Sequence, residues 1–170
     1  MKPLLQTVWQ GMDLLVNADG AEIDRIAADS IGRVVLVHRG AGDTPGDLSF
    51  AIIETGDDAV VLPASSGIAG RVHFERQTFW SERRCIYWVN EGKATLPRRL
   101  RPGLWFFGGK RPGYMRVPRL EVSGAIDKWP LEGPQTWEER KWDRIQKSRL
   151  LAPLDQAPRR GRSSGGPSAH

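Results

Sequence analysis

The chain has 170 residues, 39% of them apolar, and a formal net charge of +5. A chain of this length can remove roughly 70% of its unfolded surface from water, so a core can form without disulfides or a structural metal. Its one cysteine, Cys85, excludes an internal disulfide and a zinc finger, and the sequence has neither a signal-peptide pattern nor an apolar run of membrane-spanning length. We therefore expect a soluble cytoplasmic protein with one domain over residues 1–154. Residues 155–170 have almost nothing to bury and predict a disordered basic tail.

The charge is distributed unevenly along the chain. Residues 1–70 hold four basic and ten acidic residues, a charge of −6, whereas residues 71–170 hold the other 21 basic residues and ten acidic ones, a charge of +11. Six of the seven tryptophans also lie in the basic part. Basic side chains interleaved with aromatic rings are typical of surfaces that neutralise phosphates and stack on bases, so the pattern predicts nucleic-acid binding. The alternative is a solvated surface, with most of the rings in the core.

The first part of the chain mixes one predicted helix with predicted strands. Residues 4–16 are apolar but ambiguous between a short helix and a strand. The spacing of Ile23 and Ile26 predicts a helix over residues 19–29. Three strands are expected from β-branched and apolar runs at 33–38, 49–55 and 59–62. Residues 56–58 are typical of a hairpin turn between the last two of these strands.

Two Arg-Pro-Gly turns punctuate the second part, after a strand predicted over residues 85–89. The turns occupy residues 101–103 and 111–113, and Pro followed by Gly favours a type II turn. They predict a short antiparallel pair of residues 104–107 with residues 114–117.

A helix is expected near the C-terminus. Thr136 and Glu139 have the spacing of a capping box, which predicts a helix that begins there and ends at Leu150 or Leu151. Together with the order of strands, turns and loops before it, this helix predicts an α+β fold with a mixed sheet.

A loop of small residues at 63–70 is the most informative local feature. Gly67 and Gly70 let the backbone approach a ligand, and the loop opens onto a helix predicted from Arg71, where free N–H groups attract phosphate. Basic residues follow at once. The pattern predicts a phosphate or nucleotide site, and the alternative is an ordinary glycine-rich connection between two elements.

Carboxylates that could hold Mg²⁺ occur at several places. A metal-dependent nuclease needs two or three of them near a basic residue. Asp57 and Asp58 lie in the predicted hairpin turn, and Glu75 follows the glycine loop. Glu91 and Lys93 have the Glu-x-Lys spacing found in many restriction-type nucleases. The alternative for each is a solvated turn residue.

The strands at 49–55 and 59–62, residues 68–76 with the motif Gly70-Arg71-Val72-His73, and the strand at 86–89 resemble the ParB/sulfiredoxin-like domain. In that family a Gly-x-x-Arg or Gly-x-His-Arg signature between a strand and a helix binds nucleotide phosphate. The chain is most similar to the family's plasmid fertility-inhibition factors of the Osa type, which stop DNA from leaving through a type IV secretion system. The resemblance implies nuclease and ATPase activity, Mg²⁺ and ATP as cofactors, and as partners DNA and a coupling protein of the secretion or conjugation machinery.

The resemblance and the residue patterns together assign candidate roles. The residues expected to bind a nucleotide are Gly67, Gly70 and Arg71. The expected catalytic residues are Arg71, His73 and Glu75. The expected metal ligands are Glu75, Asp57 and Asp58. The expected nucleic-acid contacts are the basic and aromatic residues Arg76, Arg83, Arg84, Arg98, Arg99, Arg101, Trp105, Lys110, Arg111, Tyr114, Arg140 and Arg144. The alternatives are a non-enzymatic nucleic-acid-binding module and an inhibitor that docks on another protein.

Overall fold

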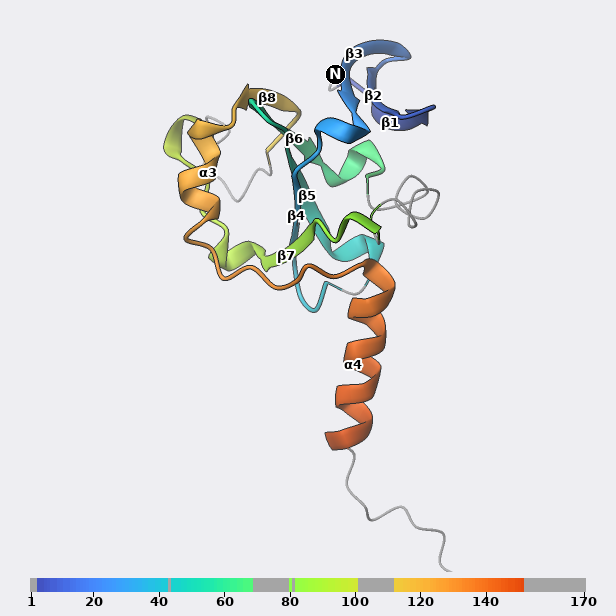
Figure 1. Ribbon diagram of the computed structural model, residues 1–170, viewed down its shortest axis with the longest axis vertical. Helices are drawn as coiled ribbons and strands as arrows, with labels where there is room; N and C mark the ends of the chain where they lie inside the picture. Colours follow the sequence, from blue (N-terminus) through green and yellow to red (C-terminus); the bar gives the residue numbers. More distant parts are fainter. Residues whose placement is uncertain (1–2, 43, 69–79, 81, 101–111, 152–170) are drawn as a thin grey trace, which may run out of the picture.

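The computed structural model describes residues 3–42, 44–68, 80, 82–100 and 112–151. Within these residues the fold is α+β, with two sheets and two α-helices (Figure 1). The strands are β1 (Leu5–Gln10), β2 (Asp13–Ala18), β3 (Ala21–Ala27), β4 (Arg33–His38), β5 (Leu48–Glu54), β6 (Asp58–Pro63), β7 (Ile86–Asn90) and β8 (Met115–Pro118). The helices are α3 (Leu120–Ile126) and α4 (Trp137–Leu151).

The larger sheet is mixed. Its strand order is β7-β4-β5-β6-β8, and β4 and β7 pair in parallel while the other neighbours are antiparallel. The smaller sheet has the order β1-β2-β3 and is antiparallel. The mixed sheet that the sequence predicts is confirmed.

Both faces of the larger sheet are buried, so alternate residues of its strands enter different cores. On one face Leu36 of β4 packs in a cluster with Leu14 and Ile26 of the smaller sheet. On the other face Val35 packs in a cluster with Val122 of α3. Accordingly, the smaller sheet and α3 lie on opposite sides of the larger sheet (Figure 1).

The prediction of an α-helix over residues 19–29 is wrong, because most of this segment forms strand β3, Ala21–Ala27. Asp19 and Gly20 both have positive φ and form the tight turn between β2 and β3, where Ala18 pairs with Ala21. Ile26 is 1% exposed but Ile23 is 45% exposed, so the spacing that suggested one helical face places the two side chains in different environments. The ambiguous segment at 4–16 forms β1 and much of β2.

The strands predicted at 33–38, 49–55, 59–62 and 85–89 are confirmed as β4, β5, β6 and β7, each within two residues at its ends. Helix α4 is also confirmed. Cys85 is buried and unbridged. Helix α3 was not predicted.

Strand β8 falls within the predicted strand at 114–117, and its partner among the described residues is β6. The proposed partner at 104–107 lies outside the described residues, as do the helix predicted after residue 70 and the tail at 155–170.

The segment before α4 is fixed to the edge of the larger sheet. The backbones of Trp88 and Glu132 exchange two N–H···O hydrogen bonds of 2.8 Å, and the Gln135 N–H donates to the Ile86 carbonyl at 2.9 Å. Gly133 lies between these contacts with a φ of +118°, and a Cβ added there would lie 2.8 Å from the Ile86 carbonyl oxygen. The close approach therefore requires glycine at this position.

We expect Gly133→Ala to lower the free energy of unfolding by about 1–3 kcal/mol, because an L-residue is strained at this φ and its Cβ meets backbone. Gly124→Ala in α3 is the control, since a Cβ there has nothing within 4 Å and alanine should raise helix stability by about 0.5–1 kcal/mol. Urea denaturation of both variants measures the difference. Equal stability of the two variants would contradict this account of the edge.

Candidate nucleic-acid interface

Helix α4 begins at the capping box that the sequence predicts. The Glu139 N–H donates to the Thr136 hydroxyl at 3.2 Å, and the Thr136 N–H donates to Glu139 Oε2 at 2.7 Å. Two of the backbone donors at the start of the helix are thereby satisfied, and α4 begins at a defined place beside β7.

Arg140 anchors the first turn of α4 to the body of the protein. It is only 7% exposed, and its guanidinium carbon lies 5.0 Å from the ring centroid of Trp88. Nη1 donates to Glu132 Oε2 at 2.8 Å, and Nη2 donates to the Ala41 carbonyl at 3.1 Å. The guanidinium is held by an ion pair, a carbonyl and an aromatic face, which together fix where α4 leaves the body.

His38, at the end of β4, completes this anchor. It is 3% exposed, and its Nε2 lies 3.3 Å from Arg140 Nη2. Guanidinium groups only donate hydrogen bonds, so this contact requires Nε2 of His38 to be the acceptor. A Cβ on Gly42 would lie 2.5 Å from the His38 ring, so the glycine backbone closes over the imidazole. Burial, followed by the charge of Arg140, lowers the pKa of His38 below 6.5.

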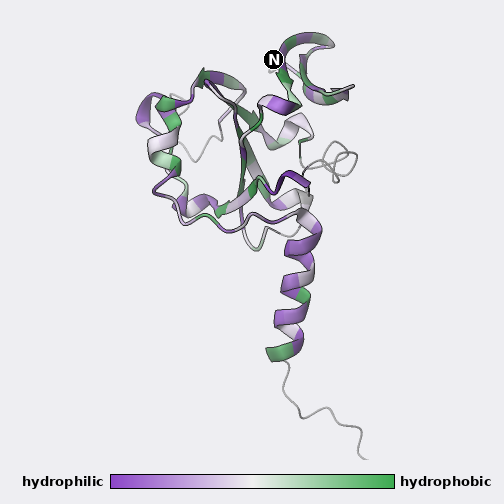
Figure 2. Cartoon of the chain, in the orientation of Figure 1, coloured by the Kyte–Doolittle hydropathy of each residue, from purple (hydrophilic) through white to green (hydrophobic). Residues whose placement is uncertain are grey.

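Beyond Arg140 the helix leaves the body and enters solvent (Figure 1). The buried residues of α4 are Trp137 and Arg140, both in its first turn. Arg144 and Lys147 continue the face of Arg140 at helical spacing, and both are exposed. Figure 2 shows the projecting ribbon as hydrophilic over most of its length.

The exposed basic side chains of α4 differ in the contacts that they make with the rest of the protein. Arg144 donates from Nη1 to the Ala41 carbonyl at 3.2 Å. No ion pair joins Lys141, Lys147 or Arg149 to another residue in the part of the chain that the structure describes. These three exposed cations are therefore available to a polyanion.

The expected nucleic-acid contacts fall into separate groups. Arg84 lies beside α4 and pairs with Glu139. Arg99 lies beside α3, with its Nε 3.4 Å from Glu121 Oε2. Arg83 and Arg98 are exposed, whereas Arg140 is buried in the anchor. The remaining candidates lie outside the described residues: Arg76, Arg101, Trp105, Lys110 and Arg111.

Tyr114 belongs to a network that joins the two sheets. Its hydroxyl donates to Asp24 Oδ2 at 2.8 Å, and burial, with the neighbouring Asp24 carboxylate, raises the pKa of Tyr114 to about 12. Arg116 donates to Asp24 Oδ1 at 2.7 Å and to Asp58 Oδ2 at 2.8 Å. The network explains why Tyr114 is half-buried, and it engages one oxygen of a carboxylate expected to hold a metal.

All three expected catalytic residues, Arg71, His73 and Glu75, lie outside the described residues, as does the expected nucleotide-binding residue Gly70. Gly67 follows the short 3₁₀ helix Ala64–Ser66 in a left-handed conformation, with a φ of +80°. Within the described ranges, no group of three His, Cys, Asp or Glu residues is arranged to hold a metal ion. The expected metal site involving Asp57 and Asp58 therefore depends on residues whose position is not described.

Three exposed cations of α4 were missing from the residues expected from the sequence to contact nucleic acid. Lys141, Lys147 and Arg149 were not among the expected contacts, although the spacing of Arg140, Arg144 and Lys147 already places three cations on one helical face. The anchoring role of His38 had no comparable signal, because it lies 102 residues from Arg140 in sequence. Glu132 is only eight residues from Arg140, but it precedes α4 and no helical spacing relates the two.

The chain matches no family model, no curated protein and no solved structure. No helix in the described residues has both the length and the apolar character needed to cross a membrane.

The anchor makes stability depend on pH. Because the pKa of His38 is lowered in the folded state, the unfolded chain binds more protons as the pH falls below about 6.5, and folding weakens. We expect the Tm to fall between pH 7.5 and pH 5.5, and to fall less in His38→Gln. Equal slopes for wild type and His38→Gln would contradict the assignment of a neutral, buried His38.

Proposed function

We propose that this chain is a DNA-binding protein whose projecting helix α4 makes the principal contact. The observation that carries the proposal is that α4 is fixed at its first turn by Arg140 and then extends into solvent with Lys141, Lys147 and Arg149 exposed and without ion pairs to described residues. The first turn of α4 is held in place, and the exposed cations beyond it are not paired with described acidic residues. This arrangement favours binding to a polyanion over packing against the acidic N-terminal part of the same chain.

The dimensions of α4 support duplex DNA as the ligand. At 1.5 Å per residue the helix is about 22 Å long, and a helix of about 10–12 Å diameter fits the B-DNA major groove, which is about 12 Å wide. Arg159, Arg160 and Arg162 follow α4 in the sequence and contribute three of the positive charges of the C-terminal part of the chain. Residues 71–170 carry +11 in total, which favours phosphate contacts.

The charge of α4 predicts how binding responds to salt. If the full chain contacts six phosphates, log K should fall against log salt with a slope of about −5 on duplex DNA. The triple variant Lys141→Gln, Lys147→Gln, Arg149→Gln should reduce the magnitude of this slope by about 3 and weaken binding at every salt concentration. Fluorescence anisotropy with a labelled duplex measures both quantities, and the Tm of the variant should stay close to wild type.

Matched single variants locate the effect. Lys147→Gln on α4 should weaken binding, whereas Arg119→Gln, an exposed arginine at the start of α3, should change it little. A salt slope near zero for the wild type would exclude DNA binding. An unchanged slope in the triple variant would move the interface away from α4. If the chain binds another protein but does not bind DNA, the alternative of an inhibitor that docks on another protein is favoured.

The catalytic part of the proposal rests on the resemblance to Osa-type fertility-inhibition factors. We propose that the bound DNA is cleaved in an Mg²⁺-dependent reaction near the glycine loop, so that a plasmid or other transferred DNA is prevented from leaving the cell. Arg71 would neutralise a phosphate, Glu75 would hold the metal or position water, and His73 would move a proton or donate to phosphate. ATP binding is proposed at the same loop.

Glu75→Ala should abolish Mg²⁺-dependent cleavage of plasmid DNA and leave DNA affinity within about twofold, because the basic surface remains. Arg71→Ala should weaken both ATP binding and cleavage. Glu82→Ala, at an exposed glutamate, is the control and should cleave like the wild type. If the wild type neither cleaves DNA nor turns over ATP with several divalent metals, the catalytic proposal fails while the binding proposal stands.

A further inference from the structure

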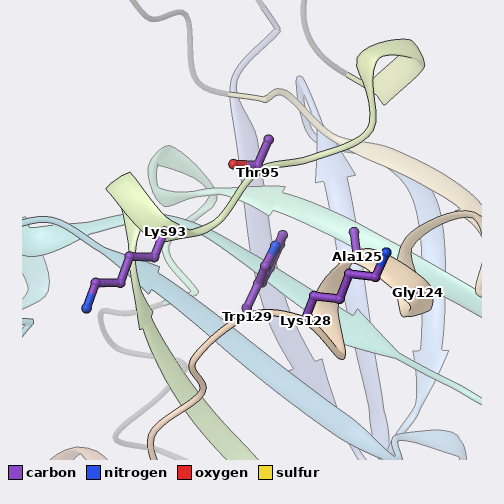
Figure 3. A pocket seen from close by; sticks show the side chains of 6 residues that line it. All are labelled: Lys93, Thr95, Gly124, Ala125, Lys128 and Trp129. Carbon is purple, nitrogen blue, oxygen red and sulfur yellow. The ribbon is translucent and has the colours of Figure 1, made fainter.

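Trp142 on α4 differs from the other tryptophans that the structure describes, because its side chain is exposed to solvent. Its exposed fraction is 58%, whereas four others are between 1% and 8% exposed: Trp80, Trp88, Trp129 and Trp137. The rings of Trp88 and Trp137 pack with their centroids 5.5 Å apart. Trp129 lies among the residues that line a pocket beside α3 (Figure 3). These buried rings contribute to the core, and the indole of Trp142 does not.

The indole of Trp142 is available to a ligand. No side-chain hydrogen bond, ring contact or cation–π contact joins it to another described residue. The ring lies on the part of α4 that projects into solvent beyond Arg140 (Figure 1). Both faces of a large flat apolar group are therefore accessible at the start of the proposed DNA interface.

The residues around Trp142 do not form the apolar stripe that a second helix would need. A helix that packs against another carries apolar side chains at every third or fourth position over several turns. On this face Glu138 lies one turn before Trp142, and Arg149 lies two turns after it. Ile145 is the apolar neighbour between them, and the exposed Leu150 lies about 80° around the helix from Trp142. This pattern favours a ligand that contacts one ring over a helix that packs along α4.

The charge beside the indole is complementary to a nucleic-acid strand. Lys141 precedes Trp142, and Arg149 lies on the same helical face about 10 Å further along the axis. Both cations are exposed. A base stacked on the indole would bring the neighbouring phosphates of its strand toward these cations, and stacking on aromatic rings is a main source of affinity for single strands. The bases of a fully paired duplex are already stacked on one another, so only an unpaired base offers its face.

We infer that Trp142 stacks on an unpaired base, so that the DNA bound by α4 includes a single-stranded part. This inference rests on the proposed DNA interface and names the kind of DNA that the interface binds. The cations of α4 attract the phosphates of any strand, whereas the indole distinguishes unpaired bases from paired ones.

The test is fluorescence anisotropy of the full chain with two labelled ligands, a blunt DNA duplex and the same duplex with a single-stranded extension. Trp142→Ala removes the ring, and Trp142→Phe keeps a flat aromatic ring. Leu150→Ala, at another exposed apolar residue of α4, is the matched control. The Tm of each variant checks that it folds, and sedimentation of each variant reports self-association.

We expect the wild type to bind the extended duplex more tightly than the blunt duplex. Trp142→Ala should weaken binding to the extended duplex about tenfold and binding to the blunt duplex less than about twofold. Trp142→Phe should keep most of the affinity, and Leu150→Ala should bind both ligands like the wild type.

Equal effects of Trp142→Ala on the two ligands, or no effect on either, would overturn the inference. If the triple variant Lys141→Gln, Lys147→Gln, Arg149→Gln binds more weakly in that case, the proposed interface stands without the stacking. The inference is also overturned if the wild type self-associates and Trp142→Ala does not, because a second copy would then cover the indole. If the wild type binds neither ligand, the proposed interface and the inference both fail.

Discussion

Strand β5 is buried along its whole length, and this burial constrains the rest of the protein. Its neighbours β4 and β6 are nearly as buried, and the two faces supply side chains to different cores. A shift of one residue would exchange the two sets of side chains, so the register between β4 and β5 is strongly specified. The polar residues of β5 lie near its ends, where Ser49 donates to Glu91 and Glu54 accepts from Arg33.

Because the faces of the larger sheet are filled, functional groups are left to its edges and to the elements that cover it. The exposed cations of α4 depend on the segment at 131–136, which pairs with edge strand β7 and aims the helix into solvent. On the other side, α3 and the segment after β7 line the pocket that includes Trp129. The same two-sided core therefore buries one tryptophan beside α3 and leaves another, Trp142, exposed on α4, and neither requires a break in the sheet.

The sequence was most informative where local chemistry decides the structure. β-branched runs predicted β4 to β7, and Thr136 with Glu139 predicted the start of α4. Segment 21–27 was mistaken for a helix because its apolar spacing was given more weight than the Asp19-Gly20 turn. Tertiary features were less accessible: Arg140 was expected on the surface, and its burial depends on Trp88, Glu132 and His38, which only the folded sheet brings together. Likewise, the sequence does not show that Lys93 and Lys128 line one pocket, because their two segments meet only in the folded protein.

The burial of Arg140 indicates that its contacts orient α4 more than they strengthen the attachment of α4 to the body of the protein. Removing water from a guanidinium is costly, and its partner Glu132 is 63% exposed on its side chain, so the ion pair recovers only part of that cost. The Nε of Arg140 is buried and has no hydrogen-bond partner among the described residues. An apolar residue would attach α4 to Trp88 at least as strongly, but it would not set a direction. The donors of Arg140 are directed at Glu132, Ala41 and His38 at once, and this combination fixes the path of α4 away from the sheet. A protonated His38 could no longer accept a hydrogen bond from Arg140. Protonation of His38 would therefore make the orientation of α4 less well defined and would also lower the stability of the fold.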